Sequence, residues 1–142
     1  MDLRPLDGTT SAAPQLDPED MAVLAADGVT TILCNRPDAE VPPSHQADAM
    51  RVAAEAAGLI FAHIPVSMPQ LTLEAVAAQR DALAGAQGKV VAYCASGTRS
   101  AVLWALAMAG TRPADDILTA CRDAGYALDG LRPQIEQLEQ QA

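Results

Sequence analysis

The sequence predicts an α/β fold in which a central, mostly parallel sheet is flanked by helices. Three short apolar segments of strand length alternate with longer segments of helical pattern. Strands that alternate with helices form parallel sheets through right-handed crossovers. The chain has 142 residues, 50% of them hydrophobic, which suits one domain with its own core. We therefore expect a single domain over residues 1–142.

The N-terminal part of the chain is expected to contain an irregular segment, a helix and a strand. Residues 1–14 are rich in Thr, Ser, Ala and Pro and are expected to be irregular, with a short strand as the alternative. Asp17 is the predicted N-cap of a helix, because Pro18 and acidic residues follow it. Gly28 is its predicted end, since glycine accepts the left-handed conformation there. The β-branched run 29–34 then predicts the first strand.

The remaining elements follow the same alternation. Ser44 is predicted to cap a helix over 45–57, which Gly58 ends, and the apolar run 59–66 predicts the second strand. The later elements are a helix from Thr72 to about Ala84, a third strand over 89–93, an apolar helix over 100–109, a helix from Pro113 to Gly125, and a C-terminal helix or tail over 131–142.

Composition and charge exclude several classes of function. The net charge of −9 and the presence of only one lysine argue against nucleic-acid binding, which needs clustered Lys and Arg. No run approaches the length of a membrane span, and no signal-peptide pattern is present. Cys34, Cys94 and Cys121 lack metal-type spacing, so we expect no metal and no cofactor. Reduced thiols without a signal indicate a cytoplasmic location. The sequence leaves the oligomeric state open.

The strongest chemical signal is Cys94 at the end of the third predicted strand. The turn that follows consists of Ala95, Ser96, Gly97 and Thr98, and then come Arg99 and Ser100 at the start of an apolar helix. The backbone N–H groups of such a turn can form a cradle for an anion. Together with the helix N-terminus they favour a thiolate on Cys94. Cys94 is therefore the predicted nucleophile.

The residues after Cys94 fit the binding of an oxyanion. Gly97 allows a backbone torsion that a side chain would oppose. Arg99 offers a planar pair of donors, and Ser100 can donate a hydroxyl hydrogen bond to the sulfur or to the anion. The alternative is a structural cysteine followed by an accidental turn, which is less compatible with this combination of residues.

Two further strand ends should meet the Cys94 turn, because ligands bind outside the carboxyl ends of parallel strands. Arg36 follows the first strand and either binds the substrate anion or forms a salt bridge. Asp38 either serves as a general acid or, like Glu40, is an exposed loop carboxylate or a partner of Arg36. Cys34 is either a buried apolar residue or a resolving thiol, and His63 is expected to be structural.

The chain resembles a bacterial family of phosphatase-like proteins related to the beta-lactamase-hydrolase-like proteins, some of which are labelled sulfur transferases. The resemblance is carried by residues 35–38 with Glu40, 63–66, 93–100, 103–106 and 124–132. It implies the fold of the dual-specificity phosphatases. It also implies that Cys94 attacks phosphorus, Arg99 binds the phosphoryl oxygens and Ser100 assists the leaving thiolate.

Two departures from that family pattern bear on the reaction. Four residues separate Cys94 from Arg99, as in the rhodanese loop, whereas phosphatases have five. Met68 stands where such phosphatases place a general-acid aspartate, and loss of that acid costs a factor of roughly 10²–10⁴.

These departures decide between three readings of the function. We expect sulfane-sulfur transfer through a Cys94 persulfide, from a small anionic sulfur donor to a thiol acceptor, because that reaction needs no general acid. The alternatives are a phosphatase that hydrolyses a phosphate ester through a Cys94 phosphocysteine, and a non-catalytic anion-binding module.

Overall fold

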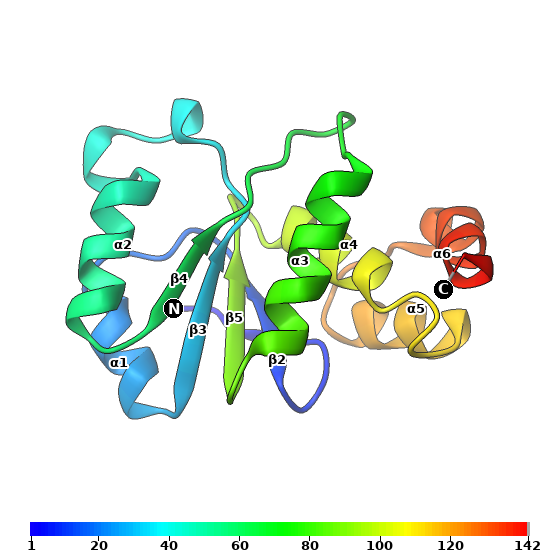
Figure 1. The fold of residues 1–142 in the computed structure, drawn as a ribbon, viewed down its shortest axis with the longest axis horizontal. Coiled ribbons are helices and arrows are strands. Elements are labelled where there is room, and N and C mark those ends of the chain that lie inside the picture. Colours follow the sequence, from blue (N-terminus) through cyan, green and yellow to red (C-terminus); the bar gives the residue numbers. More distant parts are fainter. Residues whose placement is uncertain (142) are drawn as a thin grey trace.

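The sheet of the computed structural model, which describes residues 1–141, has the strand order β1-β2-β5-β3-β4 (Figure 1). Its strands are β1 (Arg4–Pro5), β2 (Thr10–Ala13), β5 (Lys89–Tyr93), β3 (Val29–Cys34) and β4 (Ile60–His63). Only the β1–β2 pair is antiparallel. The mostly parallel α/β sheet is therefore confirmed, and β5 lies in its centre.

Helices cover both faces of this sheet. The helices α1 (Asp20–Ala26) and α2 (Ala47–Ala56) lie on one face, and α3 (Leu73–Gly85) and α4 (Thr98–Ala107) lie on the other (Figure 1). Beyond α4, the helices α5 (Ala114–Asp123) and α6 (Arg132–Gln140) form a further layer. Short 3-10 turns are formed by Asp38–Glu40, Pro43–His45 and Asp129–Leu131.

The helix α4 is the centre of the larger part of the core. Every residue from Ser100 to Ala107 is buried, which confirms the apolar helix that the sequence predicts. Trp104 and Leu103 are fully buried there and pack with Ile117 of α5 and Ile135 of α6. Burial on all sides fixes the axis of α4, and with it the turn that precedes the helix.

The N-terminal segment is the main difference from the sequence-based expectation. Residues 1–14 were expected to be irregular, with a short strand as the alternative; they contain two strands, β1 and β2, and β2 pairs in parallel with β5. The run Thr-Ser-Ala-Ala of β2 lacks a clear alternation and has only one β-branched residue, Thr10, so its pattern is a weak strand signal. Ala12 and Ala13 are completely buried, so pairing with β5 and burial decide this strand.

Two predicted helix caps are also wrong. Asp17 does not cap α1, which begins at Asp20, and its carboxylate instead lies 2.7 Å from Nε2 of His45. Ser44 does not cap α2. Its place is taken by Asp38, whose Oδ1 accepts a hydrogen bond of 2.8 Å from the Ala47 N–H. Both caps depend on loop conformations that local sequence does not determine.

Other boundaries agree more closely with the sequence. Thr72 caps α3, and its side chain accepts from the Ala75 N–H at 3.1 Å. Gly28 and Gly58 have φ angles of 92° and 83° at the ends of the first two helices, as predicted. The second strand is shorter than residues 59–66, because only Ile60–His63 pair with β3.

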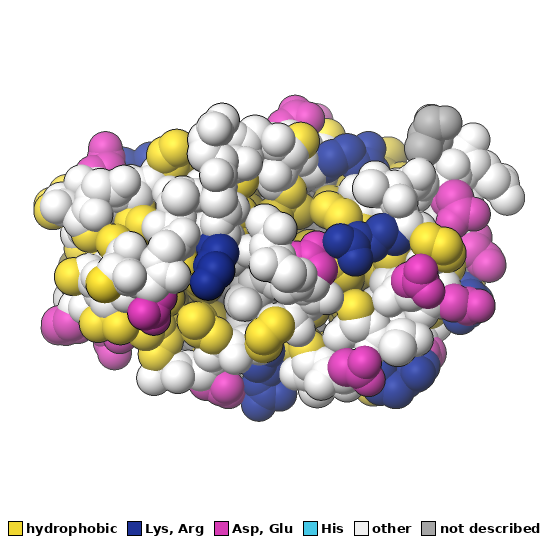
Figure 2. Space-filling model, turned by 90° about the horizontal axis from the view of Figure 1, so that it is seen from below, with side chains coloured by type: hydrophobic (Ala, Val, Ile, Leu, Met, Phe, Trp, Pro, Cys, Tyr) yellow, Lys and Arg dark blue, Asp and Glu magenta, His cyan; other side chains and the backbone are white. Residues whose placement is uncertain are grey.

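Figure 2 shows the molecule as seen from below in the orientation of Figure 1, and neither positive nor negative charge dominates this side of the surface. Basic side chains stand apart from one another there, with acidic and apolar side chains between them. Within residues 1–141, no helix combines the length and hydrophobicity needed to span a membrane.

The cap of α2 gives a prediction about stability. We expect Asp38→Ala to lower the free energy of unfolding by about 1 kcal/mol, because it removes the acceptor for an N-terminal N–H of α2. Asp38→Asn keeps an acceptor oxygen and should retain most of the stability. Urea denaturation of the three proteins measures the difference. An unchanged stability in Asp38→Ala would contradict the capping role.

Candidate active site

Cys94 lies at the centre of the sheet edge formed by the carboxyl ends of the strands. It directly follows β5, and its N–H donates to the carbonyl of Ala13 at the end of β2 at 3.3 Å. On the other side of β5, the N–H of Asn35 donates to the carbonyl of Tyr93 at 2.8 Å. Cys94 is 1% exposed and forms no disulfide. The thiol is therefore held between two neighbouring strand ends.

The turn after Cys94 (residues 94–99, the Cys94 loop) folds back toward the sulfur. Gly97 has a φ of 94° and is the N-cap residue of α4. Its N–H donates to Sγ of Cys94 at 3.1 Å, which favours a negative charge on the sulfur. The predicted role of Gly97 thus has a geometric basis, because an ordinary side chain disfavours this torsion. Ala95, Ser96 and Thr98 are exposed around it.

Arg99 is the last residue of the Cys94 loop, and the edge of its guanidinium formed by Nη1 and Nη2 is fully hydrogen-bonded. Nη1 and Nη2 donate to the two carboxylate oxygens of Glu40, each at 2.8 Å, and Nη1 also donates to the carbonyl of Val66 at 2.9 Å. A guanidinium has five N–H donors. The Nε–H and one Nη2–H therefore remain, and they lie on the same edge, where they can bind two oxygens of an oxyanion.

Glu40 is the centre of a small ion-pair network, of which the sequence suggested the pair with Arg36 but not the pair with Arg99. Its carboxylate also accepts from Nε of Arg36 at 3.2 Å, and Arg36 in turn donates to Oε1 of Gln15. Arg99, followed by Arg36, lowers the pKa of Glu40. Hydrogen bonding to Glu40, and the charge of Cys94, raise the pKa of Arg99. Glu40 is thus held ionised, and Arg36 forms the salt bridge that the sequence analysis left as one of two roles.

A buried polar network supports the start of α4. The Ser100 hydroxyl donates to Oδ1 of Asn35 at 2.8 Å, and Nδ2 of Asn35 donates to Oε1 of Gln79 and to the carbonyl of Ile64, both at 3.0 Å. Asn35, Gln79 and Ser100 are all completely buried. Because a hydroxyl has one hydrogen, Ser100 donates to Asn35 and not to the sulfur of Cys94.

Gln79 is a residue that the sequence analysis missed. Gln79 is followed directly by Arg80 and Asp81 in α3, so the sequence gives no signal that sets it apart from these polar neighbours. Whether that amide is exposed or buried depends on how α3 packs against α4, which the pattern of residues does not determine.

The site has no carboxyl group suited to act as an acid where the sequence analysis looked for one. Met68 is 53% exposed, and Asp38 is engaged with the N-terminus of α2. Glu40 is ionised between two arginines. His63 binds the carbonyl of Arg36 through Nε2 at 3.0 Å, as expected for a structural histidine. Within residues 1–141, no three His, Cys, Asp or Glu side chains are grouped as a metal site would require.

The other two cysteines are buried, as Cys94 is, and their pKa values are raised. Cys34 is 2% exposed at the end of β3, and its thiol points to the carbonyl of Arg36 at 3.6 Å. Burial is the main cause that raises its pKa, and burial raises the pKa of Cys121 to about 11. Both residues therefore stay protonated and weakly nucleophilic near neutral pH.

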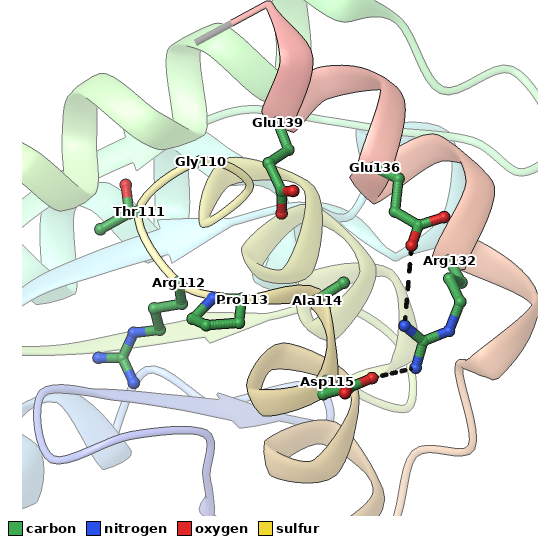
Figure 3. A pocket seen from close by; sticks show the side chains of 9 residues that line it. All are labelled: Gly110, Thr111, Arg112, Pro113, Ala114, Asp115, Arg132, Glu136 and Glu139. Atoms are coloured by element: carbon green, nitrogen blue, oxygen red, sulfur yellow. Dashed lines mark hydrogen bonds and ion pairs between the residues drawn. The ribbon is translucent and has the colours of Figure 1, made fainter.

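A depression of about 470 Å³ lies elsewhere, between the start of α5 and α6 (Figure 3). Arg132 in it is already ion-paired, with Asp115 at 2.7 Å and Glu136 at 3.9 Å. None of the residues of the Cys94 loop lines it. The chemistry is therefore assigned to the sheet edge and not to this depression.

The three thiols differ in a way that alkylation can measure. We expect iodoacetamide to modify Cys94 first near pH 7, because Gly97 donates to its sulfur and Arg99 lies beside it. Cys34 and Cys121 should not be alkylated at that pH, since burial raises their pKa values. Peptide mass spectrometry after timed alkylation identifies the modified residue. Faster alkylation of Cys34 or Cys121 would refute Cys94 as the nucleophile.

Comparisons with known proteins identify the family of the chain. A family model described as "Beta-lactamase hydrolase-like protein, phosphatase-like domain" matches residues 2–111. A beta-lactamase hydrolase-like protein of Agrobacterium fabrum is 38% identical over 87 residues, which is 61% of this chain and 20% of that protein. The chain thus spans about a fifth of the length of the curated relatives it matches.

Solved structures extend the similarity over the whole chain. The crystal structure of a candidate phosphatase from Neisseria meningitidis is 33% identical, covers 97% of this chain and 99% of its own, and has a TM-score of 0.80. The protein TpbA of P. aeruginosa, solved with phosphotyrosine, covers 99% of this chain and 91% of its own at 14% identity and a TM-score of 0.65, which supports the fold alone.

These similarities confirm the fold of the dual-specificity and tyrosine phosphatases. The expected sulfane-sulfur transfer is not confirmed, because the similar proteins support the phosphatase alternative better. The family model covers most of the length of the protein, including all of the Cys94 loop and α4. The chain belongs to the family of phosphatase-like domains of the beta-lactamase hydrolase-like proteins.

Proposed function

We propose that the protein is a cysteine-dependent phosphatase that hydrolyses aryl phosphate esters. The observation that carries this proposal is the open edge of Arg99 next to Cys94. Glu40 and the carbonyl of Val66 hold one side of the guanidinium, and the Nε–H and an Nη2–H remain for two phosphoryl oxygens. A pre-positioned oxyanion site beside a nucleophile is the arrangement that stabilises a phosphoryl transition state.

The first step is attack by the Cys94 thiolate on phosphorus. The S–P bond forms, the P–O bond to the alcohol breaks, and the electron pair leaves with the oxygen. Without a carboxylic acid at Met68, the leaving oxyanion takes its proton from water. A phenolate leaves more easily than an alkoxide, because it is much the weaker base. The geometry therefore favours aryl phosphates, such as phosphotyrosine, over alkyl phosphates.

The second step is hydrolysis of the phosphocysteine. Water attacks phosphorus, the S–P bond breaks, and Cys94 leaves as a thiolate. The resemblance assigns assistance of this leaving group to Ser100, but the hydroxyl hydrogen of Ser100 is donated to Asn35. The Gly97 N–H, at 3.1 Å from the sulfur, is the donor in position to stabilise the thiolate.

Sulfane-sulfur transfer is the second candidate, and the length of the Cys94 loop favours it. Four residues lie between Cys94 and Arg99, and the Gly97 N–H donates a hydrogen bond to the sulfur of Cys94. In this reaction a small sulfur donor transfers sulfur to Cys94, which forms a persulfide, and a thiol acceptor then takes the sulfur. Neither step needs a general acid. A non-catalytic anion-binding module is the third candidate.

The cytoplasmic location that the sequence indicates stays a prediction.

The transferred group can be identified directly. We expect the purified protein to hydrolyse p-nitrophenyl phosphate and phosphotyrosine, with loss of at least roughly 10³-fold in Cys94→Ser, since the nucleophile is removed. Phosphoserine should be hydrolysed at least 10-fold more slowly, for lack of an acid. Mass spectrometry of quenched protein should find phosphate on Cys94. Sulfur on Cys94 after thiosulfate, without aryl phosphate hydrolysis, would instead establish sulfur transfer, and binding without turnover would establish the third candidate.

Glu40 provides a test of how Arg99 is positioned. We expect Glu40→Gln to raise KM for an aryl phosphate by about 10-fold, because charged hydrogen bonds of this kind hold the guanidinium and each contributes ~1.5–3 kcal/mol. Glu74→Gln, which changes a carboxylate in the first turn of α3, is the matched control. Steady-state kinetics separate KM from kcat. A lower KM in Glu40→Gln would show that Glu40 competes with substrate for Arg99.

A further inference from the structure

Tyr126 brings a phenol from the C-terminal part of the chain to the back of the Cys94 loop. It follows α5, where its N–H donates to the carbonyl of Cys121 at 2.8 Å. Its side chain is largely buried, and the residue is 7% exposed. The hydroxyl donates to the carbonyl oxygen of Ser96 at 3.4 Å. This is longer than the roughly 2.5–3.0 Å usual for an O–H···O hydrogen bond, so the bond is a weak one.

The contact with Gly97 shows how closely the phenol packs against this loop. A Cβ added to Gly97 would overlap the phenol oxygen of Tyr126, so glycine is required for space as well as for its φ of 94°. Arg4 lies over the ring of Tyr126, 5.6 Å from its centroid, and donates to the carbonyl of Ala124 at 3.2 Å. The phenol is thus fixed from both sides.

Tyr126 and Cys94 are connected through one peptide group. The carbonyl of Ser96, which accepts from Tyr126, and the N–H of Gly97, which donates to Sγ of Cys94 at 3.1 Å, belong to the same peptide. A hydrogen bond accepted by a peptide carbonyl polarises the group and makes its N–H a stronger donor. The phenol, the peptide and the sulfur therefore form a continuous hydrogen-bond chain.

We propose that Tyr126 is a positioning residue that acts through the Ser96–Gly97 peptide to stabilise the thiolate of Cys94. The inference rests on Cys94 as the nucleophile of the proposed function, and it applies to phosphoryl and to sulfur transfer alike. No group is transferred to Tyr126. When Cys94 loses its proton to solvent, the negative charge on the sulfur strengthens both hydrogen bonds of the chain.

The proton of the phenol must stay in place for this role. Burial raises the pKa of Tyr126, the charge of Cys94 raises it further, and Arg4 acts in the opposite direction. Tyr126 therefore stays a donor at the neutral and mildly alkaline pH at which Cys94 reacts. The other ionisable groups that act on Cys94 or on the phenol are Arg99 of α4, Cys34 of β3, and Arg4 and Asp2 at the N-terminal end.

The test is the pH dependence of Cys94 alkylation, which requires no substrate. In Tyr126→Phe we expect the pH of half-maximal rate to rise by up to roughly half a unit, since cooperative strengthening is a fraction of one charged hydrogen bond. Tyr93→Phe is the matched control. The buried Tyr93 hydroxyl lies near the Cys34 thiol and the Gln15 side chain and makes no hydrogen bond to the Cys94 loop, so its removal should leave the profile of Cys94 unchanged.

Thermal unfolding of each variant separates positioning from stability. If Tyr126→Phe does not fold, 3-fluorotyrosine at position 126, a stronger donor, should move the half-maximal pH downward. An unchanged pH profile in folded Tyr126→Phe, or an equal shift in Tyr93→Phe, would overturn the inference. If the unaltered protein does not hydrolyse aryl phosphates, the proposed function is refuted. The alkylation result for Tyr126 does not depend on that outcome.

Discussion

Pairing of β5 on both of its sides is the constraint on which the rest of the structure depends. Because β5 lies between β2 and β3, Cys94 leaves the sheet at its centre and not at an edge. Its N–H is held by Ala13 of β2, while Asn35 at the end of β3 binds the carbonyl of Tyr93. The helix α4, buried from Ser100 to Ala107, then fixes the far end of the Cys94 loop. The four residues between Cys94 and Arg99 are therefore held at both ends and have little freedom, so the thiol is pre-positioned.

The polar groups of the site are placed according to the cost of burying them. The charged network of Arg36, Glu40 and Arg99 is only partly buried, with the carboxylate 35% exposed, so little desolvation opposes it. The neutral network of Asn35, Gln79 and Ser100 is completely buried, and each member has a hydrogen-bond partner. The first network orients the oxyanion-binding arginine, and the second holds the helix from which that arginine projects.

The arrangement explains how a phosphatase fold can work with a shortened loop and without an acid on the loop after β4. Donors converge on the sulfur and on the expected position of the oxyanion, whereas no neutral carboxyl group is available. In the proposed phosphatase reaction, stabilisation of charge takes the place of leaving-group protonation, which favours esters of acidic alcohols as substrates. The proposed role of Tyr126 follows the same principle, because its hydroxyl contacts the Ser96 carbonyl and would act on the thiolate through a peptide.

Local pattern in the chain is enough to encode the elements whose signals lie within a few neighbouring residues. The strand 29–34, the strand 89–93, the apolar helix after Cys94, and the glycine stops after the first two helices are all where the pattern predicts them. Cys94, Gly97 and Arg99 form one loop because they are neighbours in the chain, so a short motif suffices to identify them. Wherever hydrophobicity and backbone preference agree over a few residues, the sequence is sufficient.

Tertiary structure decided the features that depend on distant partners. The strand β2 exists because buried alanines pair with β5, about 80 residues later in the chain. Asp38 caps α2, Glu40 holds Arg99, and Ser100 turns to Asn35 because the fold brings these groups together across loops. Tyr126 reaches Ser96 from 30 residues away. A hydrogen bond depends on position to within tenths of an ångström, and only the packed chain fixes positions to that precision.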